Sequence, residues 1–99
     1  MAKHVVKPLP YANDALKGIG SKTIEIHHDK LYAGYVNKRN EIEEALAKVD
    51  RSKANQIYSD MRGMKHEETF AANGQILHEI YFAVMGGDGQ PKGEVVDKI

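Results

Sequence analysis

Residues 25–36 read EIHHDKLYAGYV, and this stretch decides the fold because it sets two histidines and two tyrosines inside an uninterrupted helical pattern. Between Ser21 and Val49 there is no proline and only one glycine, Gly34. Ser21 offers an N-capping oxygen, and Glu25 adds a carboxylate near the first turn. The pattern therefore predicts one long helix over residues 21–49, with Gly34 as the place for a bend.

An apolar stripe runs along this predicted helix at helical spacing, and we expect this face to lie in the core. Its members are Ile24, Leu31, Tyr35, Ile42, Leu46 and Val49. His27 and His28 flank the stripe on opposite sides, about 100° apart, so the two rings face different points. Periodicity does not choose between them, and a histidine beside an apolar stripe is more often a hydrogen-bonded packing residue than a metal ligand.

The rest of the chain is divided by its prolines and glycines. Pro8 and Pro10 predict an extended arm over residues 1–20, in which Asn13 or Asp14 caps a short turn. A shorter helix is expected over residues 52–62, ended by Gly63, and a third helix over residues 65–85. The apolar stripe of the third helix contains Phe70, Gly74, Leu77, Tyr81 and Met85, with His78 at its border.

These elements predict an all-α fold, a long antiparallel helical hairpin in which a shorter helix joins two long ones behind an extended N-terminal arm. The expected division is an arm over 1–20, the hairpin over 21–85 and a glycine-rich interdomain loop over 86–99 that leads to an absent α/β domain. Because the long helices are antiparallel, a border histidine from each can reach one atom.

Composition excludes several classes of protein. The 99 residues contain no cysteine, which excludes disulfides, thiolate zinc sites and thiol nucleophiles. Fourteen basic residues balance fourteen acidic ones, so no net charge holds nucleic acid or an anionic membrane. No signal-peptide core and no run of about 18 apolar residues is present. We expect a cytoplasmic protein.

One metal-binding alternative can be read from spacing. Glu25 and His28 have the Glu-x-x-His spacing of di-iron helix bundles. Such a site needs a second copy, and the corresponding segment ending at His78 has Gln75 where a carboxylate is required. The di-iron reading therefore lacks half of its ligands.

Several separated blocks of sequence, in order from about residue 8 to the end, carry a resemblance to a known family. The blocks are Leu9-Pro10-Tyr11, Ala15-Leu16, IEIHHDK (24–30), Tyr35-Val36-Asn37, FAANG (70–74), HEIYF (78–82) and GGDGQP (86–91). Together they resemble the iron/manganese superoxide dismutase family. The resemblance implies a redox metal, Mn or Fe, held by His27 and His78, with Tyr35 as the active-site tyrosine and superoxide as substrate. Lys30 would attract the anionic substrate.

The chain also departs from the family pattern. Leu31 stands where a histidine is common, Leu77 replaces an asparagine, and Phe82 replaces the tryptophan that walls the site. Gly74 resembles the manganese-type pattern, in which the outer-sphere glutamine comes from the other half of the protein, and Gln75 is one residue off the iron-type position.

The resemblance covers only the first half of the family's usual chain. The second half carries the other two protein ligands, so the partners implied are that missing C-terminal half or a second subunit. Two histidines alone would hold a metal weakly. The alternative is a stand-alone helical domain that self-associates through its apolar surface, as a homo-oligomer with weak or no metal binding.

Overall fold

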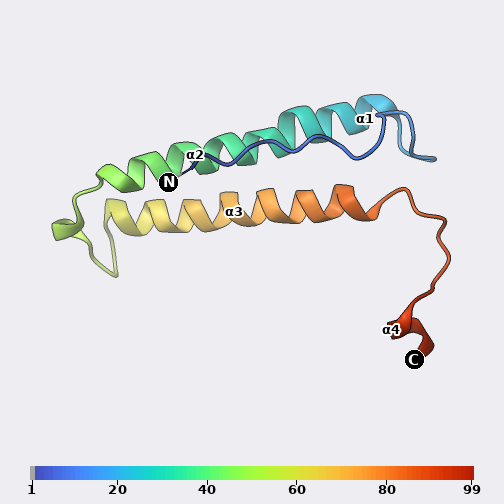
Figure 1. Cartoon of the computed structure of the whole chain (residues 1–99). Coiled ribbons are helices and arrows are strands. Elements are labelled where there is room, and N and C mark those ends of the chain that lie inside the picture. Colours follow the sequence, from blue (N-terminus) through green and yellow to red (C-terminus); the bar gives the residue numbers. More distant parts are fainter. Residues whose placement is uncertain (1) are drawn as a thin grey trace.

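The computed structural model describes residues 2–99 and shows a hairpin of two long helical rods (Figure 1). The first rod is continuous and consists of α1 (Ser21–Ile26), a π-helical segment (His27–Tyr32) and α2 (Ala33–Lys48). The second rod is α3 (Asp60–Val84), which lies antiparallel beside α2. The described residues form no strand, so the predicted all-α hairpin is confirmed. None of these helices is long and apolar enough to cross a bilayer.

Two further segments precede and follow the helical hairpin. The N-terminal arm runs along the first rod without helix or strand, and Ala15 N–H donates to the Ala12 carbonyl in one of its short turns (Figure 1). After α3 the chain leaves the end of the hairpin through Gly86, whose φ of +89° suits glycine, and reaches the four-residue helix α4 (Glu94–Asp97). The proposed domain boundaries at residues 20 and 85 stay predictions.

The π segment changes which residues of the first rod are buried. The most buried positions are Ile24, His28, Tyr32 and Val36, four residues apart. In a regular α-helix three such steps would drift by about 120° around the axis, but the wider π turns keep the four residues on one side. The prediction that Leu31 belongs to the core is therefore wrong, since its side chain is 55% exposed. The irregularity also comes before Gly34, where a bend was expected.

The core face of α3 differs from its prediction in the same way. The residues buried against the first rod are Ala71, Gln75 and Phe82, whereas Phe70 and Leu77 of the predicted stripe are 64% and 63% exposed. The helix has two neighbouring apolar lines, about 100° apart, and a wheel alone does not say which one meets α2. The second line, with Phe70 and Leu77, is left facing outward in this chain.

The predicted helix over residues 52–62 is also wrong. The connector contains only a 3-10 turn (Arg51–Lys53), in which Asp50 accepts from Ser52 N–H. Asn55 then accepts from the N–H groups of Ile57 and Tyr58, and such local side-chain bonds compete with helix formation. Ser59 caps α3 by accepting from Arg62 N–H, so α3 begins at Asp60 and continues through Gly63, which was expected to end a helix.

A buried hydroxyl ties three segments of the chain together. Tyr32 is 1% exposed, and its hydroxyl donates to Glu79 Oε2 at 2.7 Å and accepts from Lys7 N–H at 3.1 Å. Around it pack Val36 and Phe82, with Val6 and Leu9 of the arm against them. Burial opposes ionisation of Glu79, but hydrogen bonds from Tyr32 and Gln75 and the charge of Lys7 hold the pKa of its carboxyl below the usual value.

The arm is attached to the first rod at two further places. His4 and Asn40 exchange two hydrogen bonds, from His4 N–H to Asn40 Oδ1 at 2.8 Å and from Asn40 Nδ2 to the His4 carbonyl at 2.9 Å. The ring of His4 lies 3.0 Å from Glu43 Oε1. At the other end, His28 Nε2 contacts the Lys7 carbonyl at 2.7 Å. These bonds account for the extended path of the arm along the helices.

We predict that Tyr32→Phe lowers the free energy of unfolding by about 1–3 kcal/mol, because it leaves Glu79 and Lys7 N–H without their buried partner. Urea denaturation followed by circular dichroism measures the loss. The matched control is Tyr58→Phe, because Tyr58 is 88% exposed and should change stability by less than about 0.5 kcal/mol. Equal stability of the two variants would show that the buried hydroxyl contributes nothing.

Candidate metal centre

The hairpin brings one histidine from each rod into an edge-to-face arrangement. His27 comes from the π segment and His78 from α3, and their ring centroids are 4.9 Å apart with the planes at 83°. The residues are far apart in sequence, and they meet because α3 runs antiparallel to the first rod. The structure thus brings together the two histidines that the family resemblance singled out.

The orientation of His78 is set by its own helix. Its Nδ1 lies 2.6 Å from the Gly74 carbonyl, one turn earlier. A carbonyl only accepts, so this bond assigns the proton to Nδ1 and leaves the lone pair of Nε2 free. A metal-bound histidine usually has its second nitrogen fixed in this manner, which sets both the tautomer and the direction of the ring.

The surroundings of the other histidine, His27, favour its neutral form. Burial lowers the pKa of the His27 imidazole, and repulsion from the His78 ring, whenever that ring is protonated, lowers this pKa further. A neutral imidazole is the form that binds a metal ion. The lowered pKa of His27 is therefore compatible with metal binding at neutral pH. The separation of the His27 and His78 rings is compatible with it as well.

Aromatic rings surround the histidine pair. The centroids of Tyr81 and Phe82 each lie 5.2 Å from that of His27, and the ring of Tyr35 lies 5.1 Å from that of His78. Phe82 is buried and packs on both histidines, where the family pattern led us to expect a walling side chain. Such walls exclude water and lower the local dielectric.

Tyr35 and Lys30 lie on the same hollow at the surface of the hairpin. Leu31, Gly34, Lys38 and Phe70 complete much of its lining. The half-buried ring of Tyr35 contacts His78 on one side and Phe70 on the other, at 5.9 Å between the ring centroids of Tyr35 and Phe70. Lys30 is exposed to solvent, whereas Lys38 on the same rim is paired with Glu41 at 2.9 Å.

His28 has a different place from His27, which answers the question that periodicity left open. Its Nδ1 lies 2.7 Å from Asp29 Oδ1 and its Nε2 lies 2.7 Å from the Lys7 carbonyl. Both ring nitrogens are thus occupied by protein groups, and His28 anchors the arm. Glu25 forms an ion pair with Lys22 at 3.5 Å. This contact gives no support to a di-iron site built on Glu25 and His28.

The protein ligands within residues 2–99 number too few for a closed shell. No three side chains of the histidine, aspartate or glutamate type converge on one point in this part of the chain. Gln75 is engaged elsewhere, since it accepts from Arg39 and donates to Glu79 at 3.2 Å each. Within these residues, the histidine pair would thus supply two protein ligands to a metal ion.

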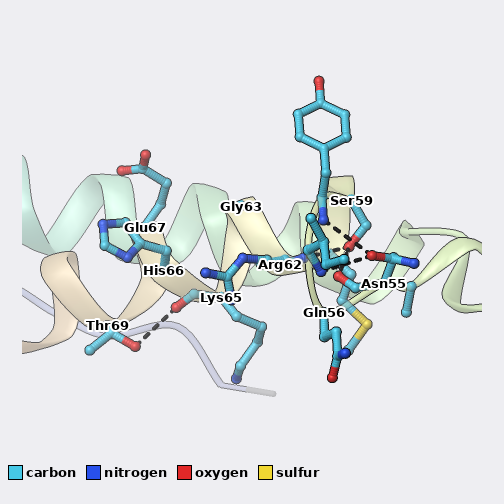
Figure 2. A pocket seen from close by; sticks show the side chains of 13 residues that line it. Asn55, Gln56, Ser59, Arg62, Gly63, Lys65, His66, Glu67 and Thr69 are labelled. Carbon is cyan, nitrogen blue, oxygen red and sulfur yellow. Dashed lines mark hydrogen bonds between the residues drawn. The ribbon is translucent and has the colours of Figure 1, made fainter.

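A second hollow lies at the tip of the hairpin (Figure 2). Asn55, Ser59, Arg62, Lys65 and His66 line part of it. Some of its polar side chains make local bonds, such as those from Ser59 Oγ to the Asn55 carbonyl and from Thr69 Oγ1 to the Lys65 carbonyl. It contains none of the residues that surround His27 and His78.

Comparison with known proteins decides the family. Residues 3–86 match the family model described as iron/manganese superoxide dismutases, alpha-hairpin domain. The chain belongs to the iron/manganese superoxide dismutase family. The match ends within two residues of the end of α3, so the family's alpha-hairpin domain corresponds to the arm and the two rods of this dismutase-family chain.

Individual relatives agree with this assignment. The chain is 45% identical over 105 residues to "Superoxide dismutase [Fe]" of Aquifex aeolicus, with 100% of this chain and 49% of the relative covered. It is 34% identical to "Superoxide dismutase [Fe]" of Pyrobaculum aerophilum, with 98% and 47% covered. It is also 34% identical to "Superoxide dismutase [Mn] 1" of Halobacterium salinarum, with 100% and 50% covered. The chain spans about half the length of the curated relatives it matches.

Sequence reasoning missed two features of the site. The bond of Tyr32 to Glu79 was not foreseen; the four-residue spacing of Ile24, His28, Tyr32 and Val36 indicates only that these residues can share one buried face. The contact of Gly74 with the ring of Tyr35 was also missed. A glycine in the middle of a helix is unfavourable by itself, and this cost was a signal of a packing role.

We predict that Mn²⁺ added to the chain broadens the NMR signals of the His27 and His78 rings before those of other residues, with weak affinity because two ligands are supplied. His78→Ala should abolish the effect, and His66→Ala is the matched control, since His66 is an exposed histidine on the same helix. Broadening centred on His4, which lies beside Glu43, would contradict the assignment.

Proposed function

We propose that this chain supplies His27 and His78 as two ligands of an iron or manganese ion in a superoxide dismutase, and that activity requires the family's second half. The observation that carries the proposal is the 4.9 Å approach of these two rings from opposite helices. The donor set fits the metal, since two imidazoles without thiolates suit iron or manganese. The free Nε2 of His78 and the neutral form of His27 support the same conclusion.

When bound, the metal supplies the one-electron redox couple by which one superoxide is oxidised to oxygen and the next, with two protons, is reduced to hydrogen peroxide. The chain's own residues serve the substrate and the protons. Tyr35 stands beside His78 with its hydroxyl available to hold a proton at the site. Lys30 provides positive charge on the hollow that contains Tyr35, which favours approach of an anion.

The outward apolar line of α3 supports the need for a second half. Phe70, Leu77 and Val84 are 64%, 63% and 72% exposed, and all three lie on the helix that carries His78. Contiguous exposed apolar surface marks a place where another protein surface packs. We propose that the family's second half covers this line and brings the remaining ligands to the histidine pair. We also propose that the protein is cytoplasmic.

The experiment is reconstitution with a second half from a family member, supplied on the same chain or separately. Metal-dependent dismutation should appear, and His27→Ala or His78→Ala should each reduce it by more than about 100-fold, since even outer-shell changes cost 10–100-fold. His66→Ala should leave it unchanged. Dismutation that survives both ligand variants would overturn the ligand assignment.

A second candidate function rests on the same exposed line. Phe70, Leu77 and Val84 could pack against a second copy of the chain, which gives a homo-oligomeric helical domain that needs no metal. Sedimentation of the 99-residue chain separates the two: a concentration-dependent dimer favours self-association, and a monomer that melts cooperatively argues against it.

A further inference from the structure

The last turn of α3 needs hydrogen-bond partners from outside the helix. The last four carbonyl groups of an α-helix have no intrahelical partner. Phe82 lies two residues before Val84, the last residue of α3, so its carbonyl is one of these four. Beyond Val84 the backbone of Met85 is extended (φ −87°, ψ 159°), and the chain turns away from the helix. The Phe82 carbonyl therefore requires a partner that α3 does not supply.

The N-terminal arm provides this partner. The hydroxyl of Tyr11 donates to the Phe82 carbonyl at 2.9 Å, across 71 residues of sequence. The arm also packs beside the turn that follows α3: a Cβ built on Gly86 would lie 3.4 Å from Leu16 Cδ2 and 3.9 Å from Tyr11 Cδ2, which are ordinary contact distances. The side chains of Tyr11 and Leu16 therefore hold the arm at the end of α3 that is opposite the connector.

The residue that accepts this bond faces the histidine pair with its side chain. The ring of Phe82 is 3% exposed, and its centroid lies 5.2 Å from that of His27 and 6.2 Å from that of His78. The carbonyl and the ring of Phe82 belong to one turn, and helix ends fray when they are not capped. Fraying of this turn would move the ring away from both histidines.

The histidine end of the hairpin depends on side-chain contacts for its closure. The connector joins α2 to α3 at the far end, so no peptide segment joins the rods directly beside His27 and His78. The Tyr32 hydroxyl links the first rod to Glu79, and the Tyr11 hydroxyl links the arm to α3 three residues further on. Tyr11 therefore restrains the last turn of α3, which lies beyond the Tyr32 bond.

We propose that Tyr11 is a positioning residue, which caps the last turn of α3 and so holds the Phe82 ring against His27 and His78. The inference rests on the proposed function for the role of these histidines as metal ligands. The hydrogen bond and the ring contacts themselves need no metal. Removal of the hydroxyl loosens the last turn, so the Phe82 ring leaves the pair more often and the affinity of the pair for a metal falls.

The first test is metal-free NMR of the 99-residue chain and of Tyr11→Phe, which lacks only the hydroxyl. A carbon-13 label in the Phe82 carbonyl should move to lower chemical shift in the variant, because the hydrogen bond is lost. Nuclear Overhauser contacts between the rings of Phe82 and His27 should weaken at the same time. Tyr58→Phe is the matched control, since Tyr58 is 88% exposed and should change neither signal.

Two results of this first test would refute the proposal. An unmoved carbonyl signal in Tyr11→Phe would show that the hydroxyl does not cap Phe82. A carbonyl signal that moves while the Phe82 contacts to His27 keep their strength would show a cap that has no positioning role.

The second test measures Mn²⁺ affinity from the broadening of the His27 and His78 ring signals, at a temperature where every variant is folded. Tyr11→Phe should weaken the affinity by about 3–10-fold, the factor that corresponds to one net hydrogen bond. Tyr58→Phe should leave it unchanged. In a Phe82→Leu background Tyr11→Phe should have little further effect, because the hydroxyl acts through the Phe82 ring. An equal loss in both backgrounds would contradict the proposal.

The two tests separate the role of Tyr11 from the dismutase assignment. If Mn²⁺ leaves both histidine rings of the unsubstituted chain unaffected, the ligand assignment loses its support, whereas the metal-free contacts of Phe82 still decide the role of Tyr11. The same contacts decide if Phe82→Leu does not fold.

Discussion

The hydrogen bonds of the buried Tyr32 hydroxyl set the relation between the two rods. A hydroxyl removed from water is costly unless it has partners, and here Glu79 and Lys7 N–H are those partners. The bond to Glu79 fixes the axial position of α3 relative to the first rod. His78 precedes Glu79 by one residue, so the same register that satisfies Tyr32 brings the His78 ring opposite His27. The bond to Lys7 adds the arm to the same junction.

Much of the hairpin follows from the sequence. The proline-free run from Ser21 to Val49 and the glycine-rich segment after Met85 indicated two long helices, and antiparallel packing indicated that histidines from both could meet. The choice between His27 and His28 could not follow from the wheel, because it depends on the π segment and on a carbonyl of the arm. Family resemblance supplied that choice.

The incorrect predictions have physical reasons of two kinds. On α3 two apolar lines compete for the interface, and only the shape of the opposite rod decides that Ala71, Gln75 and Phe82 face inward. In the connector, side chains of Asn55 and Ser59 bind nearby backbone N–H groups, which delays the helix to Asp60. Single-sequence patterns do not weigh such contacts against helix propensity.

The π segment also links the length of the first rod to the geometry of its turns. Its wider turns hold one residue more than the same axial span of α-helix would, so the residues after it keep the direction that a regular helix with one residue fewer would give them. If every residue stayed but the turns became regular, α2 would rotate by about 100° relative to α1. Val36 would leave the core and Tyr35 would turn away from α3. The extra residue and the wide turns can therefore be gained or lost only together.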